Sequence, residues 1–113
     1  MRKITFTLHF TFFHPSKEEL LKALEEAEKK GWRTSFLNSP IPFPPWKGKY
    51  GGSLFYERKT VDFYRDKEAK KNLLKKVEEG KKLLKKYKCE GIKINMYISP
   101  FSLSSFFSIS SFF

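Results

Sequence analysis

Alternation of apolar and polar residues marks a strand near each end of the first 99 residues. Every second residue from Ile4 to Phe12 is apolar, and threonine or histidine fills every position between them. The segment Ile92–Ile98 repeats the pattern. A period of two places successive side chains on opposite faces of a strand. We therefore expect two strands, each with one buried face and one open face, the open face formed by Thr5, Thr7, His9, Thr11, Lys93, Asn95 and Tyr97.

A helical period follows the first strand. His14-Pro15 ends that strand, and Ser16 begins a Ser-x-x-Glu capping box with Glu19, which satisfies free backbone donors at a helix start. Gly31 is expected to end the helix. Its buried stripe is predicted to contain Leu20, Leu24 and Ala27, widened by Leu21 and Ala23.

A second and longer helix is predicted from Asp66, which can cap it, to the segment Cys89–Gly91. Gly80 stands in its middle, where glycine costs about 1 kcal/mol relative to alanine, and indicates a kink or close packing. The inward side is predicted to consist of Ala69, Leu73, Val77, Leu84 and Tyr87, with Leu74 and Leu83 beside them.

The middle of the chain is harder to assign. Trp32–Leu37 suits a short strand, and Ser39–Gly52, with four prolines, predicts a long and partly stiff loop. Leu54–Arg65 is rich in strand-forming residues, but its apolar positions do not keep one phase. One long strand with a bulge, or a hairpin that turns near Arg58-Lys59, fits the pattern.

The resulting order β-α-β-β-α-β predicts an α+β protein of the ferredoxin-like sandwich type. In that arrangement two helices cover one face of an antiparallel sheet and the other face stays open. We expect a single domain over residues 1–99 and a Phe/Ser-rich tail over residues 100–113.

Charge and composition narrow the class of partner. The chain of 113 residues carries a net charge of +11, and the segment 67–88 holds ten lysines against three glutamates. The chain contains no glutamine, and this composition resembles that of proteins from hyperthermophiles. We therefore expect an archaeal or viral origin. Cys89 is the single cysteine, so an intramolecular disulfide is excluded. Without a signal peptide or a long apolar run, we expect a soluble, cytoplasmic protein that does not enter a membrane.

Clustered lysines on the second helix predict contact with nucleic acid. Pairs of lysines recur so that one exposed side carries a row of ammonium groups, which can displace counterions from a phosphate backbone. The alternative is a solvated helix whose lysines serve solubility. The phosphate-binding residues predicted from this pattern are Lys71, Lys75, Lys82 and Lys86.

The proline-rich loop adds an aromatic candidate. Trp46 and Tyr50 alternate with Lys47 and Lys49, and rings that stack on bases beside cations that meet phosphates suit a single strand. This resembles the RNA-recognition fold of the same architecture, in which the loop between the second and third strands does similar work. The alternative is that Trp46 folds back and fills the core.

Two short segments resemble catalytic motifs. His9-Phe10-Thr11-Phe12 is similar to the motif of two-histidine phosphoesterases, which need two copies, and the chain has one. Glu57-Arg58-Lys59 with Asp62 resembles the metal site of structure-specific DNA nucleases, but no carboxylate lies between Glu28 and Glu57 to complete that site. We therefore expect no enzyme, no metal site and no cofactor.

The tail consists of a near-repeat, FSLSSF followed by FSISSF. It can be an accident of pyrimidine-rich coding, an apolar segment that packs on the sheet or mediates a homodimer, or a docking peptide. The aliphatic-x-x-aromatic-aromatic pattern resembles peptides that bind DNA sliding clamps. The protein-interaction residues in this alternative are Leu103, Phe106, Phe107, Ile109, Phe112 and Phe113.

These patterns together predict a small basic nucleic-acid-binding protein, with RNA slightly favoured over DNA. The alternative is a protein-interaction or self-assembly module that acts through the aromatic tail.

Overall fold

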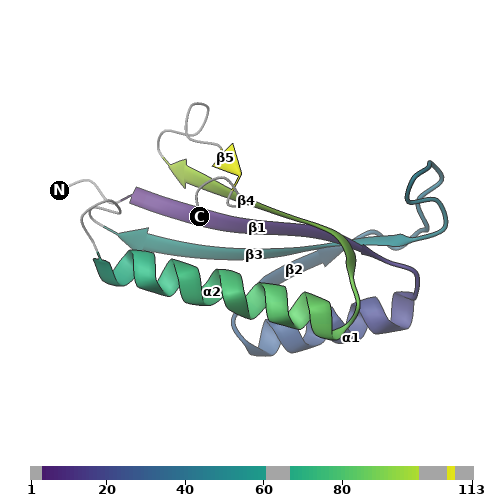
Figure 1. Cartoon of the computed structure of the whole chain (residues 1–113), viewed down its shortest axis with the longest axis horizontal. Coiled ribbons are helices and arrows are strands. Elements are labelled where there is room, and N and C mark those ends of the chain that lie inside the picture. The colour runs from purple at the N-terminus through teal and green to yellow at the C-terminus, as the bar shows by residue number, and fades with distance from the viewer. Residues whose placement is uncertain (1–3, 61–66, 100–106, 109–113) are drawn as a thin grey trace.

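The computed structural model describes residues 4–60, 67–99 and 107–108. The strands form one antiparallel sheet in the order β2-β3-β1-β4-β5, and both helices lie on the same face of it (Figure 1). The predicted α+β class is confirmed. The elements are β1 (Ile4–His14), α1 (Lys17–Lys29), β2 (Arg33–Phe36), β3 (Tyr50–Thr60), α2 (Lys67–Lys86), β4 (Glu90–Ser99) and β5 (Phe107–Ser108).

The core lies between the sheet and the two helices, because every second side chain of β1 is apolar and faces the helices. Phe6, Leu8, Phe10 and Phe12 point to the helices and are fully buried, as predicted. The helices meet them with one apolar stripe each, of which Leu20 and Leu24 in α1 and Leu73, Val77, Leu83 and Leu84 in α2 are buried. Two expected members of these stripes, Leu21 and Leu74, are instead exposed, Leu74 to 45%.

The start of α1 confirms half of the predicted capping box. The Ser16 hydroxyl accepts a hydrogen bond from the backbone N–H of Glu19 at 3.3 Å. The backbone N–H of Ser16 does not use the Glu19 side chain; it donates to Nδ1 of His14 at 2.8 Å. Helix α1 ends as expected before Gly31, whose φ of +93° favours glycine.

His14 joins three elements at the end of β1. Because the Ser16 N–H can only donate, Nδ1 is the acceptor and the ring proton lies on Nε2, which donates to the Tyr87 carbonyl oxygen at 2.7 Å. The side chain is 6% exposed. The histidine thus ties the last residue of β1 to the start of α1 and to the chain just after α2.

Removing this side chain should destabilise the protein. His14→Ala leaves a Tyr87 carbonyl and a Ser16 N–H without partners, and we expect the free energy of unfolding to fall by about 2–4 kcal/mol. His14→Gln keeps one donor and one acceptor and should lose less. Urea denaturation measures both, and a His14→Ala protein as stable as the unmodified chain would contradict this role.

Gly80 is required for close packing of α2 on the sheet. A Cβ at this position would lie 2.7 Å from Cζ of Phe10, which is closer than carbon atoms approach. Of the two roles expected for this glycine, close packing is the one the structure shows. Asp66, the predicted cap of this helix, lies outside the described residues.

Strand β3 corrects the prediction for the middle of the chain. It runs without a turn from Tyr50 to Thr60, so a hairpin near Arg58-Lys59 is wrong. It also begins earlier than expected, because Gly51 and Gly52 belong to the strand and not to the loop. These glycines leave room for neighbouring side chains: a Cβ on Gly52 would lie 2.8 Å from the ring of Phe12.

Candidate nucleic-acid interface

The outer side of α2 carries the predicted row of lysines. Lys71, Lys75 and Lys82 are exposed, and none of them forms an ion pair within residues 4–60 and 67–99. Glu78 lies in the same row, 3.9 Å from Lys81. Among the residues that the structure describes, the row therefore has three ammonium groups without an ion pair and one carboxylate, that of Glu78, which pairs with Lys81.

Lys86, the fourth predicted member of the row, is neutralised from α1. Its ammonium group lies 2.8 Å from Oε1 of Glu26, and the Tyr87 hydroxyl donates to the same oxygen at 2.9 Å. These hydrogen bonds, from Lys86 first and Tyr87 second, lower the pKa of Glu26 to about 2. Glu26 thus stays ionised at neutral pH and offsets the Lys86 charge.

Lys76 serves packing. Its ammonium group lies 5.4 Å from the ring centre of Trp32 and 5.0 Å from that of Tyr56, and it donates to the carbonyl of Lys30 at 2.9 Å. It also pairs with Glu79 at 2.9 Å. This lysine joins α2 to the end of α1 and to β3, so it is not available for a phosphate.

The loop before β3 folds back onto the sheet. The ring of Trp46 stacks on Phe13 with centres 4.4 Å apart and an interplanar angle of 12°, and a Cβ on Gly91 would lie 2.6 Å from it. Trp46 thus folds back onto the protein, as the alternative expects, but it is half-buried on Phe13 and does not belong to the buried core. These contacts leave less ring surface for a base.

The other three predicted loop residues differ in their surroundings. Lys49 pairs with Glu90 of β4 and lies 5.5 Å from the ring centre of Trp46. Tyr50 is half-buried, starts β3 and packs against the core. Lys47 is exposed and has no ion pair among the described residues. The loop therefore offers one available cation, beside a tryptophan that is already stacked.

The sheet face opposite the helices shows the predicted residues in rows across the strands. Ser35 pairs with Ser53, Ser53 with Thr11, and Thr11 with Lys93. The next row aligns Arg33, Phe55, His9 and Asn95 in the same way. Because directly paired residues point to the same face, these two rows lie side by side on the open face.

An aromatic stack stands in the second row. His9 and Phe55 lie with ring centres 4.3 Å apart and an interplanar angle of 11°, and Tyr97 lies 6.2 Å from His9. Burial lowers the pKa of His9, which keeps the imidazole neutral at pH 7. Its Nε2 has no hydrogen-bond partner in the described residues. The ring is placed as a neutral aromatic group on this face.

The segment Glu57-Arg58-Lys59, which resembles a nuclease metal site, contributes a surface ion pair. Glu57 lies 3.5 Å from Arg33 of β2, and both side chains are well exposed. Asp62 lies outside the described residues. Within the part of the chain that the structure describes, no three His, Cys, Asp or Glu residues gather as metal ligands.

Burial raises the pKa of Cys89 to about 11, so its thiol stays protonated at neutral pH.

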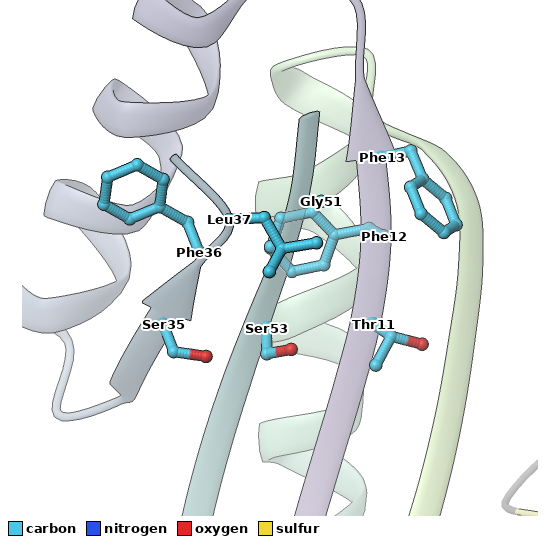
Figure 2. Close-up of a pocket in the computed structure, with 9 residues that line it drawn as sticks. Thr11, Phe12, Phe13, Ser35, Phe36, Leu37, Gly51 and Ser53 are labelled. Atoms are coloured by element: carbon cyan, nitrogen blue, oxygen red, sulfur yellow. The ribbon is translucent and has the colours of Figure 1, made fainter. Parts of the chain in front are cut away.

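A hollow opens beside the row of hydroxyl groups, at the end of the open face. Figure 2 shows the side chains of Ser35, Ser53 and Thr11 next to one another on β2, β3 and β1. The hollow has a volume of about 280 Å³. We call it the Gly51 pocket; its lining is Thr11, Phe12, Phe13, Ser35, Phe36, Leu37, Gly51, Gly52 and Ser53. No local pattern in the chain indicates this pocket, because it depends on the pairing of β2 with β3.

The tail is described only where it forms β5. Phe107 pairs with Met96 and Ser108 with Asn95, which adds a short strand beyond β4. The other predicted interaction residues lie outside the described residues: Leu103, Phe106, Ile109, Phe112 and Phe113.

Comparison of the chain with family models, with curated proteins and with solved structures gives no match. Neither described helix is both long and apolar enough to cross a bilayer. The class of protein that the structure defines is an α+β protein with an antiparallel sheet covered on one face by two helices.

Proposed function

We propose that the protein binds nucleic acid without catalysing a reaction on it, with RNA slightly favoured over DNA. The observation that carries this proposal is the row of exposed lysines on α2, Lys71, Lys75 and Lys82, which have no carboxylate partner among the described residues. They project from one side of a helix in a chain of net charge +11. A concentrated positive field attracts a polyanion more strongly than the same charge spread evenly.

The ferredoxin-like sandwich is the fold that we propose for this function. The strand order β2-β3-β1-β4 and the two helices on one face support it. In such an arrangement the sheet face away from the helices is available for a ligand. RNA is favoured because proteins that recognise it act mostly on unpaired bases, and aromatic residues lie on that face.

Binding should weaken steeply as salt rises. Each phosphate that a lysine neutralises releases a counterion, so the logarithm of the affinity for a single strand falls with the logarithm of salt by roughly 0.7 per contact. Fluorescence anisotropy with a labelled 20-nucleotide RNA, at about 50 and about 200 mM salt, measures this. A salt-independent affinity, or no binding at the lower salt, would remove the proposal.

A second candidate function is association of copies through the tail. The pairing of Phe107 and Ser108 with β4 favours it, because a tail strand that pairs within one chain can pair in the same way with a second copy. Deleting residues 100–113 and measuring mass by light scattering separates the two functions. Loss of a dimer with unchanged RNA binding would assign the tail to assembly alone.

A further inference from the structure

We propose that the Gly51 pocket binds one unpaired nucleobase, so that the protein prefers single strands to duplexes. This inference rests on the proposed function and adds to it a site and a class of ligand. Both helices cover one face of the sheet (Figure 1), and the pocket is lined by Ser35, Ser53 and Thr11 from the row on the other face (Figure 2).

The pocket exists because residue 51 has no side chain. A Cβ on Gly51 would lie 3.3 Å from Cδ1 of Leu37 and 3.7 Å from Cε1 of Phe13, so these two side chains flank the space. The volume of about 280 Å³ is near the lower end of ligand pockets, which begin at roughly 300 Å³. It has room for one ring system and not for a longer stretch of chain.

The lining matches the chemistry of a base. Leu37 and Phe13 provide apolar contact for a flat ring, and the hydroxyls of Ser35, Ser53 and Thr11 stand together on one side (Figure 2). A hydroxyl can both donate and accept, so these groups suit the mixed donors and acceptors on a base edge. An aliphatic ligand would leave them without partners.

Charge on the same face selects a nucleic acid over an uncharged ring compound. Lys93 ends the row of hydroxyls on β4, is exposed, and has no ion pair among the described residues. Arg33 on β2 is 76% exposed, and its contact with Glu57 at 3.5 Å is an exposed pair worth little. These cations lie where the phosphates that flank a bound base can reach them.

The pocket should discriminate against duplexes. In a double helix the faces of each base are stacked and its pairing edge is used, so a base must leave the stack before it enters a pocket of this size, at a cost of about a few kcal/mol. The neighbouring stack of His9 and Phe55 offers further aromatic surface to a flexible strand. A single strand gains both contacts without that cost.

Two substitutions test the pocket. Gly51→Val places a side chain in the pocket; the glycine does not have a positive φ, and the nearest side-chain atom to a Cβ there is Cδ1 of the exposed Leu37, at 3.3 Å. Thr11→Val removes one hydroxyl at nearly constant shape. Thr7→Val is the matched control, because Thr7 lies on the same strand and face but outside the pocket.

The probes are a labelled 10-nucleotide RNA, its duplex, and an abasic strand of the same length. We expect the unmodified protein to bind the RNA more tightly than either other probe. Gly51→Val should weaken RNA binding about tenfold and leave the abasic strand unchanged, and Thr7→Val should change neither. Should Gly51→Val fail to fold, Thr11→Val carries the test with a loss of about threefold.

The outcomes separate the two proposals. If none of the probes binds at low salt, the proposed function is wrong and the pocket proposal falls with it. If the probes bind but the abasic strand or the duplex binds as well as the RNA, only the pocket proposal is overturned. The same holds if a folded Gly51→Val protein binds RNA like the unmodified chain.

Discussion

Replacing Phe10 with alanine should lower the free energy of unfolding by about 3–5 kcal/mol. The ring is fully buried at the centre of β1, meets Trp32 edge to face at 5.3 Å, and packs against Gly80 of α2. Its removal opens a cavity between the sheet and α2. Since whole domains are stable by only about 5–15 kcal/mol, urea denaturation should show a large shift.

The contact with Gly80 makes a sharper test, because the effect of a second substitution should change sign. In the unmodified protein, Gly80→Ala gains about 1 kcal/mol of helix propensity but presses a methyl group against the Phe10 ring, and we expect a net loss of about 1–2 kcal/mol. In the Phe10→Ala background the same methyl has room, so Gly80→Ala should stabilise by about 1 kcal/mol. Additive effects would contradict the close packing of α2 on β1.

Replacing Lys71, Lys75 and Lys82 together with glutamine should weaken binding to single-stranded RNA on the order of 100-fold at about 50 mM salt. The reason is the loss of three phosphate contacts, with the counterions that each one releases. Because the side chains are exposed, the free energy of unfolding should change little. Anisotropy measures the affinity and thermal unfolding confirms the fold.

Helix α1 supplies the matched control. Lys22 and Lys29 of α1 and Lys30, its C-cap, each pair with a glutamate one turn earlier, at 3.5, 3.8 and 3.5 Å. Replacing these three with glutamine lowers the net charge equally but leaves α2 intact. We expect a loss of less than about fivefold. Equal losses in both triple variants would mean that total charge matters and the place of the lysines does not.

The sequence was sufficient for the local structure, and it failed where distant segments meet. The alternation in β1 and the apolar stripes of the helices depend on near neighbours, and their prediction is confirmed except for Leu21 and Leu74, which are exposed. The role of Gly51 and Gly52 depends on Phe12 and Phe13 of a paired strand, so glycines that suggest a loop are in fact strand residues. The pairing of β1 with β3 reveals that these glycines are strand residues, and the local sequence does not.

The candidate site divides in the same way. A helical period is enough to place Lys71, Lys75 and Lys82 on one exposed side. It cannot reveal that Glu26 of another helix neutralises Lys86, or that Trp46 finds Phe13 across the chain. Acidic and aromatic partners far away in sequence decide which of the candidate groups remain available to a ligand.

The central claim is that positive charge gathered on α2 holds a polyanion. Its most direct test is the slope of log affinity against log salt for a single-stranded RNA, measured for the unmodified protein and for the Lys71, Lys75 and Lys82 triple variant. We predict that the triple variant loses about 2 units of slope, while the α1 control keeps the slope of the unmodified protein. The same slope in the unmodified protein and the α2 variant would contradict the claim.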